Sequence, residues 1–320
     1  MNIYKTFNRL FATALMLAPA LAAAEFPDRP LRLIVPFPAG GVSDILGRSY
    51  ADKLKDQLGQ PVIVDNRPGA TGAIGTETAI RAPADGYTLV LNSSALVINP
   101  WFGKQPFDYA KDLTPIARTG ETPYIVTVDA KLPIQNLEQF IAYSKTNPGK
   151  LGCGTYGNGS PPHLALELFK LSAGVDILHV PYKTSIQAVP DMFSGQLGCV
   201  FEPPPGSIAH VKSGRLRIVA HTGPGAMASY PGVDAIGKRY PGAAVIGWQA
   251  IFVASATPKP VVERLRSAMA KALATPELQQ KLRDAGFEPS TGSLDDFEKE
   301  IAADHEKYGK VIKATGIRLE

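Results

Sequence analysis

Residues 36–48 read Pro-Phe-Pro-Ala-Gly-Gly-Val-Ser-Asp-Ile-Leu-Gly-Arg, and this stretch decides the fold. An apolar run at 31–35 leads into the turn. Apolar side chains then recur at helical spacing, at Ile45, Leu46, Tyr50 and Leu54. A strand, a glycine turn and a helix in this order aim the free N–H groups of the helix start at an anion. Because Gly40 and Gly41 carry no Cβ, a ligand can approach their main chain closely. A tight turn that merely needs a positive φ is the alternative interpretation.

Short apolar runs alternate with helical patterns over the first third of the chain. We predict strands at 31–36, 62–66 and 87–92, with helices at 42–58 and 72–81 between them. This order predicts a largely parallel sheet. Right-handed crossovers place the carboxyl ends of such strands at one edge of the sheet, where open α/β proteins bind their ligands.

The pattern repeats and predicts a second α/β unit with its own sheet. We expect strands at 151–155, 177–182, 197–201 and 217–221, and helices at 160–173 and 185–194. Two further strand-like runs, at 124–128 and 250–253, lie near the changeover and would be the crossing segments of a two-domain binding protein. The tail from Pro258 returns to helix at 261–274, 276–285 and 294–315. We expect this tail to pack on the first domain, because it brings no strand partner of its own.

The first 24 residues are typical of an export signal. Lys5 and Arg9 form a basic start, residues 10–21 are apolar, and three alanines ending at Ala24 provide a small-residue cleavage site. An uncleaved anchor is the alternative, but the apolar stretch is too short for a good membrane span. We therefore expect cleavage near Ala24 and a periplasmic protein.

The charge balance argues against a nucleic-acid or anionic-membrane partner. Without the two basic residues of the signal, 31 Lys and Arg stand against 29 Asp and Glu, a formal charge of +2. Only two cysteines occur, Cys153 and Cys199. An oxidising compartment permits a disulfide between them, and two buried free thiols remain the alternative.

A second glycine turn follows the predicted strand at 151–155 and reads Gly-Thr-Tyr-Gly-Asn-Gly-Ser-Pro-Pro-His over residues 154–163. Ser160 is at a natural N-cap and Pro161 at the first helical position. The free N–H groups there, with the hydroxyls of Thr155 and Ser160, can bind a carboxylate. The alternative is that Ser160 only caps its own helix. His163 is expected to face the ligand or to cap the next turn.

Three other interpretations fail: a dinucleotide-binding motif, a catalytic serine and a metal site. Residues 152–157 match G-x-G-x-x-G by letter, but the glycines lie inside the apolar run instead of after it. Ser160 and His163 lack a nucleophile elbow and an orienting acid. The five histidines show no metal-ligand spacing, so neither a metal nor a cofactor is expected.

Other polar residues follow predicted strands. Ser94 ends the third strand at the ligand-binding edge, and Tyr182 opens a helix where it could reach a cleft. Glu202 precedes three prolines and would either accept a hydrogen bond from a ligand or remain a solvated loop carboxylate. Trp248 is either core or a cleft wall, and core is the expectation.

The ordered motifs resemble those of periplasmic solute receptors of the tripartite tricarboxylate transporter system, also called Bug receptors. The resemblance covers nearly all of the chain after the signal. Its motifs are the stretches at 26–30, 35–41 with Asp44 and Arg48, 64–70, 84–89, 157–160 with His163, 180–183 and 195–197.

The resemblance implies a two-lobed α/β binding protein of the type II, Venus-flytrap class, without catalysis. The first domain would comprise 25–123 plus 246–320 and the second 124–245, with hinges near 123–127 and 240–250. Two loops would hold a ligand carboxylate through N–H groups, hydroxyls and bridging waters. The implied contacts are Phe37, Ala39, Gly40, Gly41 and Asp44 from one lobe, and Thr155, Gly157, Ser160 and His163 from the other. The implied partner is a membrane permease, and such receptors are commonly monomers.

Two departures from the family pattern fall where the distal part of the ligand would lie. Tyr156 is bulky where small residues are frequent, and it could stack on an aromatic carboxylate. Glu202 stands with Pro203 where Asp-Asn is frequent, and it would favour an amino acid or a hydroxy acid. Dicarboxylates, tricarboxylates, amino acids and aromatic acids therefore all stay open. The rival functions are a secreted α/β enzyme using Ser160, His163 or Glu202, and a ligand-presenting partner of a membrane sensor.

Overall fold

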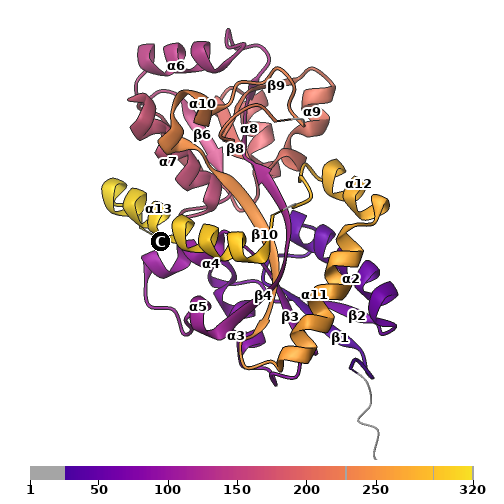
Figure 1. Cartoon of the computed structure of the whole chain (residues 1–320). Helices are drawn as coiled ribbons and strands as arrows, with labels where there is room; N and C mark the ends of the chain where they lie inside the picture. Colours follow the sequence, from indigo (N-terminus) through magenta and orange to yellow (C-terminus); the bar gives the residue numbers. More distant parts are fainter. Residues whose placement is uncertain (1–25, 228, 291, 319–320) are drawn as a thin grey trace, which may run out of the picture.

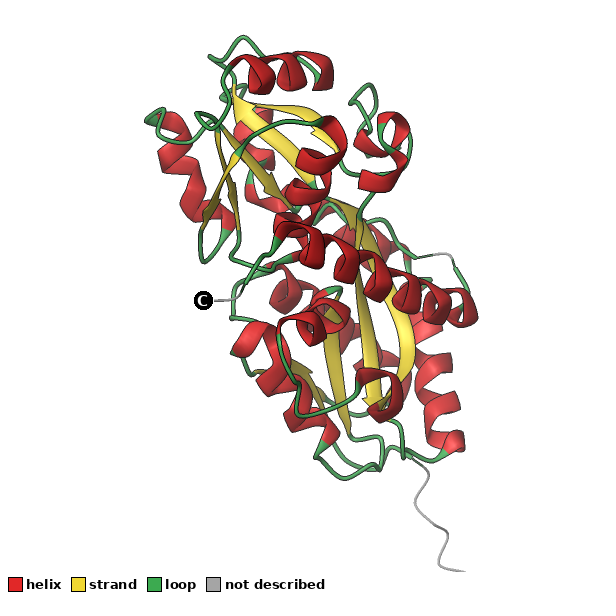
Figure 2. Cartoon of the chain, turned by 90° about the vertical axis from the view of Figure 1, so that its left-hand side faces the viewer, coloured by secondary structure: helices red, strands yellow, loops and turns green. Residues whose placement is uncertain are grey.

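The computed structural model describes residues 26–227, 229–290 and 292–318, so the predicted export signal lies outside it. Within these residues ten strands form two separate five-stranded sheets, each covered by helices (Figures 1 and 2). The chain is therefore an α/β protein with two lobes, as expected. We call the lobe that contains strand β1 (Leu31–Val35) lobe 1 and the other lobe 2.

The sheet of lobe 1 has the order β2 (Val62–Asn66), β1 (Leu31–Val35), β3 (Thr88–Ser93), β10 (Ile246–Ala254) and β4 (Leu113–Pro123). Strand β10 runs antiparallel to both of its neighbours, so the sheet is mixed. The helices of its first half are α2 (Val42–Leu58), η2 (Ala70–Gly72), α3 (Ala73–Ile80), α4 (Ala95–Ile98), η3 (Asn99–Phe102) and α5 (Tyr109–Asp112). The helices α11 (Lys259–Leu273), α12 (Pro276–Asp284) and α13 (Leu294–Thr315) follow β10.

The sheet of lobe 2 repeats this plan with the order β7 (Leu178–Pro181), β6 (Gly152–Thr155), β8 (Cys199–Glu202), β5 (Ile125–Asp129) and β9 (Leu216–His221). Here β5 is the reversed strand. A disulfide joins Cys153 to Cys199, which face each other across β6 and β8. The helices of this lobe are α6 (Leu137–Thr146), α7 (Pro161–Ala173), η4 (Ser185–Ala188), α8 (Val189–Phe193), η5 (Pro204–Gly206), α9 (Ile208–Lys212), α10 (Ile236–Arg239) and η6 (Pro241–Ala243).

Strand register makes the carboxyl edges of the two sheets face each other. In lobe 1, β4 ends at Pro123, and the next strand, β5, begins lobe 2 at Ile125. Strands β1, β3 and β4 run in the same direction, so their carboxyl ends lie toward the crossing. In lobe 2, Ile125 pairs with Glu202 and His221, the carboxyl ends of β8 and β9, and β6 runs parallel to β8. The edge of each sheet at which α/β proteins bind ligands therefore borders the junction.

Helix α13 joins the two lobes across this junction. It packs against α4 and β4 of lobe 1 and against α7 of lobe 2, and it crosses the middle of the molecule in Figure 1. The buried Trp248 of β10 donates its indole N–H to Asp304 of α13 at 3.1 Å and packs edge-on against Phe297. The expectation that Trp248 belongs to the core is confirmed. The tail packs on lobe 1 as expected, and α13 adds a contact with lobe 2.

Candidate functional site

The first glycine turn forms the loop from β1 to α2 in lobe 1. Gly40 has φ +79° and Gly41 is the N-cap of α2, with no side-chain cap of its own. Ala39, Gly40 and Gly41 are exposed, and the carbonyl of Phe37 accepts from the amide of Asn66 at 3.2 Å. A cap without a competing side chain leaves the first N–H groups of α2 for a ligand.

Asp44 shapes this loop from inside. Its buried carboxylate accepts the N–H of Gly40 at 2.8 Å and pairs with Arg48, whose Nη2 lies 3.0 Å from Oδ1. Burial alone would raise the pKa of Asp44, but the bonds from Gly40, Arg48 and Asn66 outweigh it and the pKa is lowered. Asp44 is thus a charged brace for the exposed glycines, whereas the resemblance implied a ligand contact.

The second glycine turn forms the loop from β6 to α7 in lobe 2, where Gly157 and Gly159 have φ values of +107° and +68°. Ser160 is the N-cap of α7: its hydroxyl accepts the N–H of His163 at 3.4 Å and donates to the carbonyl of Gly157 at 2.8 Å. Ser160 therefore caps its helix. The hydroxyl of Thr155 is buried and makes a 2.7 Å hydrogen bond with Nε2 of His179.

His163 is buried beneath this loop and holds it by one hydrogen bond. Its Nδ1 accepts the N–H of Gly159 at 3.0 Å, and its ring stacks on His179 with 3.6 Å between the centroids. Burial lowers the pKa of His163 to about 3, helped by His179 and Lys170. Burial lowers the pKa of His179 to about 4, helped by Lys170. Both imidazoles are therefore uncharged at neutral pH.

The tyrosine of the second loop reaches the crossing segment. The hydroxyl of Tyr156 is hydrogen-bonded to that of Tyr124, which lies between β4 and β5. Tyr308 of α13 approaches both, and its buried hydroxyl has no hydrogen-bond partner among the described residues. Ser94 is fully buried beside them, and its hydroxyl accepts the N–H of Trp248 at 3.4 Å. Burial raises the pKa of all three phenols, so this cluster is neutral.

Two other predicted residues are engaged inside lobe 2. Tyr182 donates its hydroxyl to Asp191 at 2.6 Å, and burial together with that bond raises the pKa of Tyr182 to about 12. Glu202 is fully buried, and Oε1 accepts from Thr127 at 3.3 Å and from Ser207. The alternative of a solvated loop carboxylate is therefore wrong for Glu202, because the chain after β8 brings the hydroxyl of Ser207 to the buried carboxylate.

The structure thus brings together residues that the sequence did not connect. His179, Tyr124 and Tyr308 lie beside predicted residues but come from β7, the crossing segment and α13. Gln249 of β10 was also missed, and its amide donates to Ser43 of α2 at 3.0 Å. No spacing rule links such distant positions. Only His179 carried a signal, since it shares a strand pattern with residues predicted to end at the same edge.

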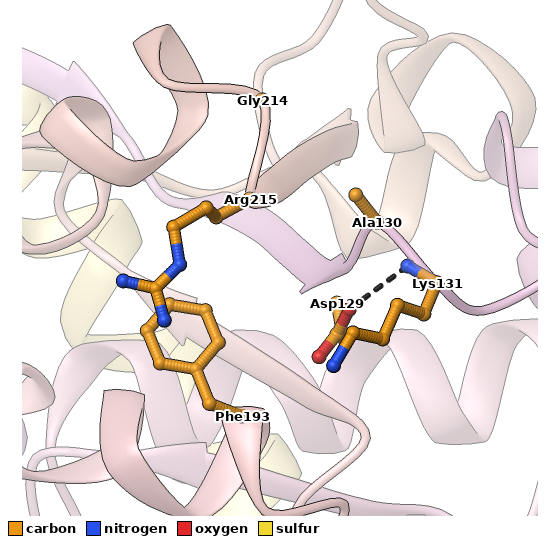
Figure 3. Close-up of a pocket in the computed structure, with 6 residues that line it drawn as sticks. All are labelled: Asp129, Ala130, Lys131, Phe193, Gly214 and Arg215. Carbon is orange, nitrogen blue, oxygen red and sulfur yellow. Dashed lines mark hydrogen bonds between the residues drawn. The ribbon is translucent and has the colours of Figure 1, made fainter.

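A hollow elsewhere on lobe 2 is separate from these loops. Figure 3 shows its lining, where the guanidinium of Arg215 covers the ring of Phe193 at 3.7 Å and Asp129 accepts the N–H of Lys131. Its volume is about 410 Å³. It lies at the carboxyl end of β5 and the start of β9, at the edge of the sheet away from the junction.

Among the described residues no cluster of three or more His, Cys, Asp or Glu is arranged to hold a metal. None of the helices described is both long and apolar enough to traverse a bilayer. The polar groups at the junction are instead N–H groups, hydroxyls and neutral rings, which suit an anionic organic ligand.

Comparison with known proteins agrees with this geometry. Residues 46–317 match the sequence profile of the family described as tripartite tricarboxylate transporter family receptor. The chain is 33% identical to the protein BugT of Bordetella pertussis over 313 residues, which cover 97% of this chain and 96% of BugT.

Solved structures show the same fold. One described as a periplasmic transporter is 35% identical, with a TM-score of 0.82, and the match covers 92% of this chain and all of that one. The R. palustris protein Rpa4515 with adipate is 30% identical over the same shares of the two chains, with a TM-score of 0.83.

Proposed function

Because this chain belongs to the tripartite tricarboxylate transporter family of receptors, we propose that it binds a small organic carboxylate between its two lobes. On this proposal it acts after export into the periplasm, with its signal removed near Ala24, and delivers the ligand to a membrane permease. It performs no chemistry on the ligand. Monomers suffice for this role, because both loops come from one chain.

The observation that carries the proposal is the pair of glycine loops at facing sheet edges. Each follows the carboxyl end of a parallel strand and leads into a helix start, at Gly40–Gly41 in lobe 1 and at Gly157–Ser160 in lobe 2. Both therefore present backbone N–H groups and a helix dipole of the sign that attracts a carboxylate. Two such loops on opposite sides of one junction suit a ligand with an anionic group held between them.

The adipate bound to the R. palustris relative makes aliphatic dicarboxylates the first class to test. The hydroxyls of Tyr124, Tyr156 and Tyr308 add neutral hydrogen-bonding groups at the junction, which fit a second carboxylate without requiring a further positive charge. Aromatic acids, amino acids and hydroxy acids, which the sequence left open, are the competing ligand classes.

We infer that binding closes the lobes by rotation near 123–127 and 240–250, with the ligand favouring the closed state. Each lobe keeps its own sheet, and in the part of the chain that the structure describes the crossing segments, α13 and neighbouring loops connect the lobes. The carboxylate then bridges the two loops in the closed form.

A thermal-shift screen of the exported protein tests the proposal, with adipate, malate, citrate, glutamate and benzoate as probes. A ligand present at a hundredfold excess over its Kd stabilises the native state by about 2.7 kcal/mol. We expect a clear rise in Tm with one class and recovery of that compound unaltered. Turnover of the bound compound would instead support a secreted enzyme.

Variants locate the binding site. The double variant Ser160→Ala with His163→Ala should lose most of the Tm rise while remaining folded, because both residues hold the lobe 2 loop. The matched control carries Ser213→Ala with His210→Ala, which changes the same residue types on and after α9, away from the junction. Equal ligand shifts in both double variants would place the ligand elsewhere. Co-purification with a permease or with a sensor kinase separates the two delivery routes.

A further inference from the structure

The stacked imidazoles of lobe 2 form a continuous set of contacts under the β6–α7 loop. His179 bonds the hydroxyl of Thr155 at 2.7 Å, Thr155 reaches the carbonyl of Gly157 at 3.4 Å, and Ser160 donates to that same carbonyl. On the other side, His163 accepts the N–H of Gly159. Polar groups of the turn at Thr155, Gly157 and Gly159 are therefore tied, directly or through one residue, to one of the two stacked rings.

The hydrogen bond from Gly159 fixes the protonation state of His163. An imidazole nitrogen can accept an N–H only through its lone pair, so Nδ1 must be unprotonated and the proton must sit on Nε2. That Nε2 lies 3.9 Å from Oε1 of Glu167, which Lys170 binds at 2.7 Å. A second proton on His163 would remove the acceptor of Gly159 and break the contact that holds the turn.

The stacking makes a charged pair unfavourable. The ring centroids are 3.6 Å apart with an angle of 10° between the planes, so two imidazolium ions would repel at close range. The charged groups near the rings are Glu167 and Lys170, both on α7, and Lys170 itself disfavours a proton on either ring. Burial adds to the cost of charge on His163, which is 4% exposed.

We propose that His163 and His179 are positioning residues that lock the carboxylate-binding loop of lobe 2 in shape, and that the lock holds only while both rings are uncharged. The inference rests on the proposed function in taking this loop as the anion-binding loop. Opening the loop exposes the rings, which then take up protons with an ordinary pKa of about 6.5. Acid therefore favours the open loop, and the site loses its geometry before the protein unfolds.

Hydrogen exchange of the Gly159 amide measures the lock without any ligand. In the exported protein we expect the protection factor of this amide to fall between pH 6.5 and 5, by about tenfold per pH unit for each ring that takes up a proton on opening. A protection factor that stays within about threefold from pH 7 to pH 5 would overturn the proposal.

Substitutions at position 179 separate the stacking of that ring on His163 from its ability to take up a proton. His179→Phe keeps a flat ring on His163 but cannot be protonated. The fall in the Gly159 protection factor should therefore lose one factor of about ten per pH unit. His179→Gln keeps a polar tip toward Thr155 and should also become shallower. His210→Phe is the control, because His210 packs edge-on against Phe193 on α9, outside the loop. A slope that stays the same in the His179 variants would contradict the role of the pair.

The imidazole nitrogens of the unmodified protein provide a test that needs no variant. Their NMR shifts should show His163 neutral down to pH 5, with the proton on Nε2. Titration of His163 near 6.5, or a proton on Nδ1, would overturn the proposal. Adipate binding at pH 7 is measured alongside. A failure of adipate to bind with the lock intact counts against the proposed ligand class alone, whereas binding without pH-dependent protection counts against the lock alone.

Discussion

The hydroxyl of Thr222 accepts the backbone N–H of Tyr124 at 2.9 Å, and the same hydroxyl donates to the carbonyl of Val245 at 2.7 Å. Tyr124 and Val245 lie on the two segments by which the chain passes between the lobes. Thr222 also exchanges backbone bonds with both, so one buried residue ties the two crossings together. Any rotation of the lobes must keep or break this connection.

Thr222→Val removes the hydroxyl with little change in shape. It leaves the N–H of Tyr124 and a lone pair on Val245 without their partner, which costs about 1–3 kcal/mol in buried surroundings. Urea unfolding should show this loss in the free energy of unfolding. Thr222→Ser keeps the hydroxyl and should recover more than half of it, so equal losses in both variants would assign the effect to packing instead.

Gly247→Ala places a methyl group against the ring of Tyr124, 2.9 Å from Cζ. Because Tyr124 is buried at the crossing, its ring has little room to move aside, and we expect the free energy of unfolding to fall by about 1–3 kcal/mol. Gly242→Ala is a suitable control, because nothing lies within 4 Å of the methyl group there. If Gly247→Ala loses no more stability than the control, the ring of Tyr124 moves aside at little cost.

Removing the disulfide with Cys153→Ala and Cys199→Ala should lower stability without changing the fold. The bridge closes a loop with a sequence separation of 46 residues, which the chain-entropy relation values at about 4 kcal/mol. Thermal unfolding with and without a reductant measures the same quantity in the unmodified protein. Identical Tm values under both conditions would show that the pair contributes nothing to stability.

Stability should fall as the pH drops from 7 toward 4. The pKa values of His163 and His179 are lowered on folding, so their neutral forms stabilise the protein above about 6.5, the unfolded value. Between that pH and the folded values near 3 and 4, the unfolded chain binds more protons, and the free energy of unfolding falls by about 1.4 kcal/mol per unit for each ring. Urea midpoints at pH 7, 6 and 5 test this, and His179→Phe should reduce the slope. Midpoints independent of pH would contradict it.

Asp44→Ala should weaken binding of whichever carboxylate the screen identifies. The N–H of Gly40 loses its charged acceptor, and such bonds contribute about 1.5–3 kcal/mol, so a ten- to hundredfold rise in Kd is expected. Asp44→Asn keeps an oxygen for Gly40 and should remain within about threefold of the original Kd in calorimetry. If the alanine variant binds as tightly as the asparagine variant, the hydrogen bond from Gly40 to position 44 does not support ligand binding.

Most of the elements near the site could be predicted from sequence because their local signals agree. Helix α2 and strand β2 have the predicted bounds, and so does α13. Apolar spacing and a glycine stop mark both helices, and Ser293 caps the start of α13. Strand β4 was missed: it contains Pro115, Gly120 and Pro123, which signal turns, yet pairing with β10 keeps it extended. Helix α6 was also missed, although Asn136 caps it at 2.9 Å.

The sequence predicted largely parallel sheets, and each sheet contains one antiparallel strand that the prediction lacked. Alternation of strands and helices indicates crossover connections, but it says nothing about a strand that returns from another lobe. Strand β10 enters its sheet reversed after an excursion through lobe 2, and β5 does so on first arriving there. The residues of the proposed site follow the same rule. Local chemistry predicted the two loops, whereas the places of His179 and Tyr308 beside them depend on the packing of distant segments.

The position of β10 has a consequence for the order in which the chain can fold. In the finished sheet β10 lies between β3 and β4 and pairs with both, so these two strands join one sheet only when residues 246–254 arrive. Lobe 2 is continuous between the crossings and can assemble first, whereas lobe 1 waits with two open strand edges. Such edges favour pairing with other chains. Folding chains are thus most vulnerable to aggregation in the interval before β10 pairs with β3 and β4.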